Sequence, residues 1–264
     1  MPRAARSGDP QARLLRSGSG GEAVAREERL NAPVGKGRDT LAAMASALGR
    51  IGLIGDIHAE DATLALALRV LADVGADQIM AVGDLVDGRG SVDQCCALLA
   101  EAGALVVRGN HERWFLASTM RELPDATLAV AGETRSFLAA LPKTRRFEVP
   151  GGEVMLCHGL GDDDMAAVAV DANGFSIRHN PPLEALIKED RPLWVLNGHT
   201  HRRGVWSHRR LTVINAGTLF ADHEPCFGLV DLAGGEVTFF DVLPGGRVGA
   251  KETVALPPPL GGRR

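Results

Sequence analysis

Residues 51–58 read IGLIGDIH, and this short stretch decides the fold. An apolar run over residues 51–55 predicts a buried strand, and Asp56 and His58 follow it directly. A helix is predicted next, because apolar residues recur at steps of three and four. These residues are Leu64, Leu68, Leu71 and Val74. The stretch therefore predicts a strand that leads through a polar loop into an amphipathic helix.

The same order of elements repeats further along the chain. Residues 78–82 predict a second strand and residues 104–107 a third. Between them, Ser91 and Gln94 have the spacing of a capping box, which predicts the start of a second helix. Strands joined by helical crossovers form a largely parallel sheet.

Shorter strands are predicted in the second half, and their closer spacing favours antiparallel pairing. They cover residues 146–149, 154–157, 193–196, 211–214, 227–232 and 236–241. We therefore expect one mixed-sheet α/β domain over residues 50–241, either as a single sheet or as two stacked sheets. Residues 242–264 are expected to be a C-terminal tail.

Residues 1–49 are rich in Arg, Ala, Gly and Ser and have no apolar core of the secretory type. We expect them to be a disordered extension, or the product of a wrongly assigned start, with Met44 as the alternative first residue. An Arg-rich targeting segment is a third interpretation.

Composition narrows the class of protein. The chain has 264 residues, a formal net charge of −4 and a pI near 6.1, which argues against a broad nucleic-acid surface. Its longest apolar runs fall short of the roughly 20 residues that span a bilayer, so we expect no membrane segment. The four cysteines, Cys95, Cys96, Cys157 and Cys226, are spaced unlike a disulfide framework and predict reduced thiols and a cytoplasmic protein.

Polar side chains follow five of the predicted strands, where ligands bind in α/β sheets. The five loops read GDIH (55–58), GDLVD (83–87), GNHE (109–112), CHG (157–159) and NGHTH (197–201). They hold five of the eight histidines. Each motif alone has an ordinary interpretation as a helix cap, a turn or a solvated loop. Their joint occurrence predicts a metal site, and mixed carboxylate, amide and imidazole donors suit Mn, Fe or Zn.

These motifs, in this order, resemble those of the calcineurin-like metallophosphoesterase superfamily, small bacterial-type phosphoesterases and diadenosine-tetraphosphatase-like enzymes above all. The resemblance implies a four-layer α/β sandwich of two mixed β-sheets flanked by helices. It also implies two divalent metal ions, with manganese expected first and iron or zinc as alternatives. By motif position, one metal would bind Asp56, His58 and His201, the other would bind Asn110, His158 and His199, and Asp84 would bridge them.

The resemblance assigns further roles to three residues. His111 would be the general acid that protonates the leaving group, while the metals activate the attacking water. Asp87 would orient His111, its alternative being a turn residue. Arg89 would grip the substrate, although serine/threonine protein phosphatases carry that arginine one residue earlier, so Arg89 facing water is an equal alternative.

We therefore predict a metal-dependent phosphatase or phosphodiesterase that acts on a small phosphorylated molecule. The alternatives are a nuclease of the same superfamily, which would need a basic groove, and a non-catalytic metal-binding scaffold. The complete ligand set and His111 argue against the scaffold. The sequence does not decide the oligomeric state, and neither nucleic acid nor a membrane is an expected partner.

Overall fold

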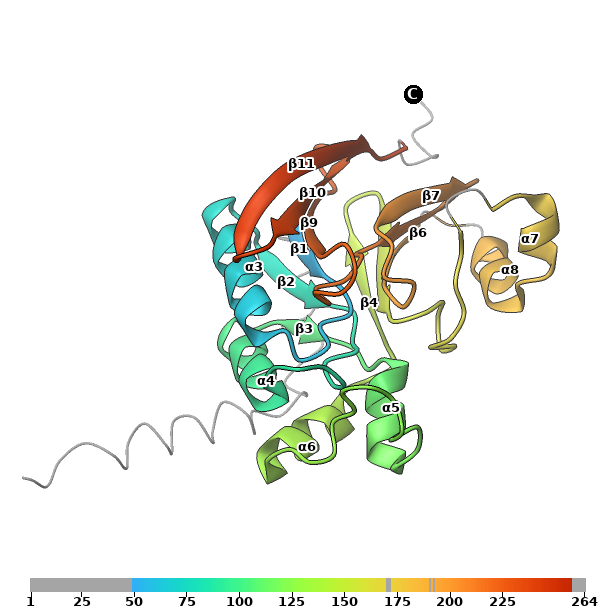
Figure 1. Cartoon of the computed structure of the whole chain (residues 1–264). Helices are drawn as coiled ribbons and strands as arrows, with labels where there is room; N and C mark the ends of the chain where they lie inside the picture. The colour runs from blue at the N-terminus through green and yellow to red at the C-terminus, as the bar shows by residue number, and fades with distance from the viewer. Residues whose placement is uncertain (1–48, 170–171, 190, 192, 258–264) are drawn as a thin grey trace, which may run out of the picture.

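Two β-sheets form the centre of the molecule (Figure 1). The computed structural model describes residues 49–169, 172–189, 191 and 193–257. The first sheet has the strand order β11-β10-β9-β1-β2-β3, and the second has the order β4-β5-β6-β8-β7. The expectations for residues 1–48 lie outside the described residues.

The strands of the first sheet are β1 (Arg50–Ile54), β2 (Gln78–Ala81), β3 (Leu105–Val106), β9 (Cys226–Asp231), β10 (Glu236–Leu243) and β11 (Arg247–Ala255). Those of the second sheet are β4 (Thr144–Val149), β5 (Gly152–Cys157), β6 (Leu193–Asn197), β7 (Gly204–His208) and β8 (Leu211–Asn215). Within the first sheet, β1, β2 and β3 are parallel; within the second, β5, β6 and β8 are parallel. The remaining strand pairs are antiparallel.

Helices cover the outer face of each sheet, so the molecule has four layers (Figure 1). Against the outer face of the first sheet lie α3 (Asp61–Asp73) and α4 (Val92–Glu101). Beyond the β3 edge lie α5 (Asn110–Ala117) and α6 (Gly132–Ala140), and α6 packs against α4 and α5. Beside the second sheet lie α7 (Gly174–Arg178) and α8 (Pro181–Lys188). The predicted four-layer sandwich of two mixed sheets is confirmed.

The two sheets pack on each other through a continuous apolar core. Leu53 of β1, Leu156 of β5 and Val237 of β10 are fully buried there. From Ile51 to Ile54 the β1 strand is apolar and buried because both of its faces are covered, one by the second sheet and the other by helices. This explains why residues 51–55 show no alternation of polar and apolar residues.

The first sheet extends beyond the predicted boundary at residue 241. The β10 strand continues to Leu243, and β11 pairs with it in antiparallel register from Arg247 to Ala255. Residues 247–255 are therefore an edge strand and not part of a tail. The strand could not be predicted from the sequence, because most of its side chains are exposed and are charged or small, as is common at a sheet edge.

All four cysteines are free and buried, as predicted from their spacing. Among the residues that the structure describes, none of the helices has the length and apolar character needed to cross a membrane.

Replacing Leu53 by alanine is expected to lower the free energy of unfolding by about 2–5 kcal/mol, because a cavity would open between the sheets. Denaturant unfolding followed by circular dichroism measures the change. Leu128→Ala is the matched control, since Leu128 is 79% exposed and its truncation is expected to cost less than about 0.5 kcal/mol. Equal losses in the two variants would contradict the assigned core.

Candidate metal centre

The five predicted loops meet at one edge of the two sheets. Each begins at the carboxyl end of a parallel strand: β1, β2 and β3 in the first sheet, and β5 and β6 in the second. Parallel strands all end at the same side of a sheet, so their loops gather there. The structure thus brings together side chains that lie up to 145 residues apart, from Asp56 to His201.

Asp56, His58 and His201 form the first of the groups whose donor atoms converge. The Nε2 atoms of His58 and His201 lie 3.1 Å apart, and His201 Nε2 is 3.6 Å from Asp56 Oδ1. The other ring nitrogen of His58, Nδ1, donates to the Asp87 carbonyl at 2.9 Å, which leaves Nε2 as the atom that faces the group. These are the three residues predicted to hold one metal.

The second group is built around His158. Its Nε2 lies 3.2 Å from Asp84 Oδ2 and 2.9 Å from Asn110 Oδ1, while its Nδ1 donates to the Val82 carbonyl. His199 Nδ1 is 3.1 Å from the same Asn110 oxygen. Asp84 adjoins both sets, because it also belongs to a convergent group with His58 and His111. The structure therefore brings together all seven predicted ligands.

Asp84 is held by the start of helix α5. Its Oδ1 accepts the His111 backbone N–H at 3.0 Å, so the carboxylate caps the helix N-terminus, where negative charge is favoured. Gly109 lies so close to this carboxylate that a Cβ atom at position 109 would collide with it. A glycine before Asn110 is therefore required for Asp84 to reach the helix.

Glu112 is a buried residue of the site that the sequence analysis passed over. One of its oxygens accepts the N–H groups of Leu85 and Val86, and the other accepts those of Asp84 and Gly109. Its carboxylate therefore ties the loop after β2 to the start of α5. Its position at the third residue of a helix, after Gly109, was the available signal, because glutamate there often caps a helix N-terminus.

Several site residues have left-handed backbone conformations. The φ angles are 45° for His58, 51° for Asp84, 66° for Asp87, 69° for His199 and 58° for His201. Residues other than glycine adopt such angles rarely, and the strain persists only where surrounding contacts enforce it. The backbone conformation of these loops is therefore imposed by their contacts and not by the φ preferences of their residues.

The electrostatics of the site follow from burying two carboxylates together. Burial raises the pKa of Asp56 to about 7. Burial alone would raise the pKa of Asp84 too, but the imidazoles of His158 and His111 hold it below its usual range. Burial would lower the pKa of His158, yet Asp84 and Asp56 raise it to about 10. For His201, burial and the neighbouring His58 lower the pKa to about 3.

This donor set fits divalent cations. The carboxylate oxygens of Asp56 and Asp84 need positive charge in a buried place, and the imidazoles of His58 and His201 are held neutral. The Nδ1–H group of His158 donates to the Val82 carbonyl. Its Nε2 is therefore the nitrogen whose lone pair would bind a cation. Mixed oxygen and imidazole ligands suit Mn, Fe or Zn.

Beside the ligands, His111 and Asp87 form a close pair. His111 Nδ1 donates to Asp87 Oδ2 at 2.7 Å. Asp87 in turn accepts from the Arg121 guanidinium at 2.7 and 3.0 Å and from the Thr127 N–H at 2.8 Å. Arg121 could not be found from the sequence, because its contact with Asp87 spans 34 residues and no motif marks it.

Arg89, for which substrate contact and a water-facing side chain were equal alternatives, forms ion pairs with two carboxylates. Its guanidinium binds both oxygens of Asp222, at 2.7 and 3.2 Å, and one oxygen of Asp125 at 3.1 Å. The side chain is 63% exposed. Its predicted contact with substrate stays a prediction.

Comparisons with known proteins identify the superfamily of the chain and structures of similar fold. Residues 50–235 match the calcineurin-like phosphoesterase superfamily domain, and the chain belongs to this superfamily. Its fold is similar to that of a metallophosphoesterase from Sphaerobacter thermophilus (TM-score 0.56, 22% identity, 75% of this chain and 89% of that one). It is also similar to that of a candidate diadenosine tetraphosphatase (TM-score 0.50, 24% identity, 79% and 94% covered). A search of the curated proteins found no match.

The superfamily and the clustered donors together support a metal-dependent phosphoesterase, a hydrolase of phosphate esters. The sequence-based assignment to the superfamily is confirmed. At these levels of identity, the structural relatives establish the fold alone.

Replacing Glu112 by glutamine is expected to lower the free energy of unfolding by about 1–3 kcal/mol. The amide NH₂ would face backbone N–H groups that now donate to a carboxylate oxygen. Chemical unfolding in the presence of a chelator isolates this effect from metal binding. Glu101→Gln, an exposed change at the end of α4, is the control and is expected to stay within about 0.5 kcal/mol of wild type. A Glu112→Gln protein as stable as this control would disprove the bracing role.

Proposed function

We propose that this protein is a dinuclear metal-dependent phosphoesterase that hydrolyses phosphate mono- or diesters of small molecules. Asp56, His58 and His201 would hold one cation, Asn110, His158 and His199 would hold the other, and Asp84 would contact both. Two such cations polarise the phosphoryl oxygens and lower the pKa of the attacking water. The convergence of these donors from five loops is the observation that carries the proposal.

His111 is positioned to supply a proton to the leaving group. Its Nδ1 is occupied by Asp87, so Nε2 is the nitrogen directed toward the site, 4.0 Å from Asp84 Oδ2. Burial alone would lower the pKa of His111, but the hydrogen bond to Asp87 and the charge of Asp84 raise it. A histidine that keeps its proton near neutral pH suits a general acid.

Asp87 is a positioning residue for that acid. Arg121 and Thr127 hold both of its oxygens, so the carboxylate cannot rotate away from His111. These contacts support a fixed direction for His111 Nε2 before substrate arrives.

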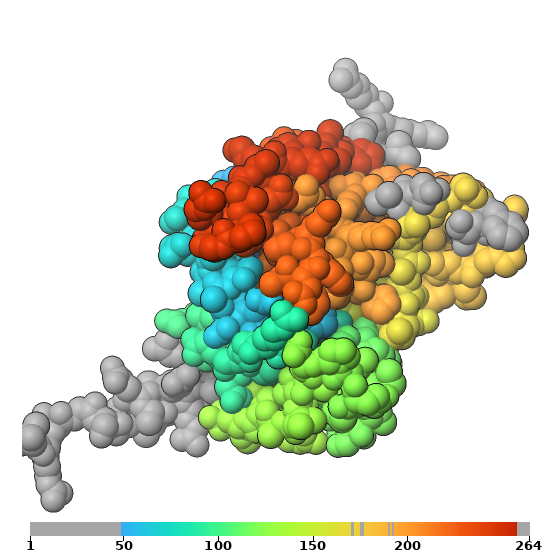
Figure 2. All heavy atoms as spheres, in the orientation of Figure 1, coloured from blue at the N-terminus to red at the C-terminus, as the bar shows by residue number. Residues whose placement is uncertain are grey.

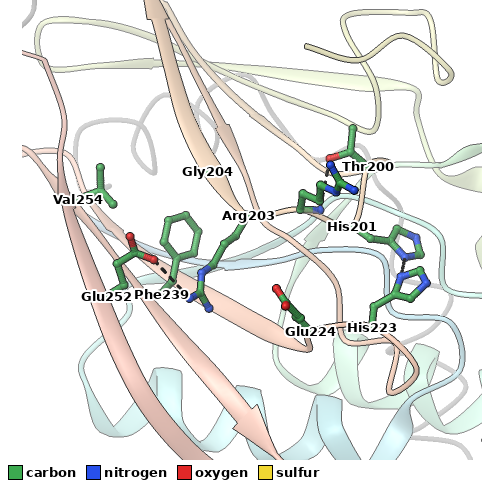
Figure 3. Close-up of a pocket in the computed structure, with 10 residues that line it drawn as sticks. Thr200, His201, Arg203, Gly204, His223, Glu224, Phe239, Glu252 and Val254 are labelled. Carbon is green, nitrogen blue, oxygen red and sulfur yellow. Dashed lines mark hydrogen bonds and ion pairs between the residues drawn. The ribbon is translucent and has the colours of Figure 1, made fainter. Parts of the chain in front are cut away.

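A cavity beside the site supports a small substrate (Figure 3). It has a volume of about 730 Å³ and is bordered by His201, Arg202, Arg203 and Phe239. Cavities of roughly 300–1,000 Å³ are typical of small-molecule sites. Arg203 is already neutralised by Asp241 and Glu252, so the cavity is not a broad cationic groove of the kind a nuclease needs.

Four buried free thiols favour a reducing compartment such as the cytoplasm.

Metal-stripped protein is expected to hydrolyse neither p-nitrophenyl phosphate nor bis-p-nitrophenyl phosphate, and added Mn²⁺ should restore turnover of at least one. In the proposed mechanism the cations lower the pKa of the attacking water, so their removal takes away the nucleophile. Release of p-nitrophenol measures the rate, and elemental analysis counts the bound metal. Protein that holds two metals and cleaves neither ester nor a panel of small phosphate esters would contradict the proposed activity.

Replacing His111 by alanine is expected to lower kcat by about 10²–10⁴ while leaving the metal content unchanged. The loss should be larger for an alkyl phosphate than for p-nitrophenyl phosphate, because p-nitrophenolate needs less protonation to depart. His208→Ala is the control, since His208 lies on β7 and stacks on Trp206 away from the site. Equal losses for both esters would rule out the acid role.

A further inference from the structure

A sixth loop, residues 216–225 after β8, also contacts the candidate metal centre. The Thr218 hydroxyl and the Leu219 N–H both donate to the Asp56 backbone carbonyl, at 2.8 and 3.1 Å. The Phe220 ring lies 5.3 Å from the ring of His58 and 5.2 Å from that of His223. The loop therefore covers the group formed by Asp56, His58 and His201.

His223 of this loop touches His201 directly. The two Nδ1 atoms are 2.6 Å apart, and the ring centres are 4.7 Å apart (Figure 3). Two nitrogens at this distance share a proton in a hydrogen bond. The other nitrogen of His201, Nε2, faces His58 and Asp56.

What His201 Nε2 binds decides which of the two Nδ1 atoms donates in this hydrogen bond. If His201 Nε2 binds a cation through its lone pair, Nδ1 carries the proton and donates it to His223 Nδ1. His58 and His158 are held in the same way, but their Nδ1 atoms donate to backbone carbonyls of Asp87 and Val82. His201 differs because its acceptor is a side chain that can be replaced.

We propose that His223 is a positioning residue for the metal centre: it accepts the Nδ1–H of His201 and so fixes the tautomer and direction of that ligand. The proposal rests on the assignment of His201 as a metal ligand in the proposed function. Partners of this kind, behind a histidine ligand, typically change metal affinity by about 10–100-fold.

The loop that carries His223 is fastened from outside by Arg89. The Arg89 guanidinium binds both oxygens of Asp222, the residue before His223. The residue before Asp222 is fastened too, because the Ala221 N–H donates to Glu60 Oε1 at 3.0 Å. In Figure 2, the orange loop after β8 meets the blue-green segment after β2 at this point. Arg89 thus holds the residue next to His223 in place, which gives it a role other than gripping substrate.

The test is a Mn²⁺ titration of metal-stripped wild type, His223→Ala, His223→Asn and the control His208→Ala. His223→Ala is expected to weaken one of the two Mn²⁺ sites by about 10–100-fold and to leave the other unchanged. His223→Asn should recover most of the affinity, because the asparagine Oδ1 takes the place of Nδ1 as acceptor. His208→Ala should match wild type.

Unchanged Mn²⁺ affinity in His223→Ala would overturn the proposal. So would a His223→Asn protein as weak as His223→Ala, since a hydrogen-bond acceptor would then not be what matters. Neither readout needs turnover. A wild type that binds two Mn²⁺ ions but hydrolyses no phosphate ester would therefore refute the proposed activity while the role of His223 is still decided by the titration.

A double-mutant cycle tests the fastening by Arg89. Arg89→Gln and Asp222→Asn are each expected to weaken the same Mn²⁺ site by a few-fold, and the double variant should lose no more than the larger single loss. If Arg89 instead gripped the substrate, Arg89→Gln alone would raise KM and the Mn²⁺ affinity would not move. That outcome would remove Arg89 from the proposal.

Discussion

The carboxylates of Asp56 and Asp84 are buried side by side, and the rest of the site is arranged around this charge. Burying ions is costly unless hydrogen bonds and opposite charges surround them. Each carboxylate accepts the backbone N–H of a distant loop: the His199 N–H at 3.0 Å for Asp56, and the His111 N–H at 3.0 Å for Asp84. The His158 ring also faces Asp84 Oδ2, and the His201 ring faces Asp56 Oδ1. The need to satisfy two buried charges thus determines where five separate loops must lie.

The fold and the site are therefore parts of one structure. The two sheets bring the carboxyl ends of their parallel strands to a common edge, and the loops then bond to each other across it. The His58 N–H donates to the Asp84 carbonyl at 2.7 Å, and the Gly198 N–H donates to the His158 carbonyl at 2.9 Å. Groups held in place before substrate binds need no reorganisation during the reaction. This preorganisation is the main source of electrostatic stabilisation of a transition state.

The sequence predicted the parts of this arrangement that depend on local pattern. The loop after each parallel strand could be found because an apolar run ends in Asp, Asn or His, as at Asp56 and Asp84. The second sheet's edge strand β7 and the edge strand β11 were missed, because exposed edges carry weak alternation. Arg121 and His223 were missed for a different reason. Each acts through a contact with a residue more than 20 positions away, and nothing in its own neighbourhood marks it.

The start of α5 shows how one rigid turn serves three purposes. Successive residues of a helix point about 100° apart, so Asn110, His111 and Glu112 face different ways. Asn110 meets His158 and His199, His111 meets Asp87, and Glu112 turns back to the N–H groups of the loop after β2. The distance between candidate ligand and candidate acid is consequently set by helix geometry and not by a flexible loop. Because Glu112 ties that turn to the loop that carries Asp84 and Asp87, movement of the helix would carry the candidate acid His111 together with Asp87.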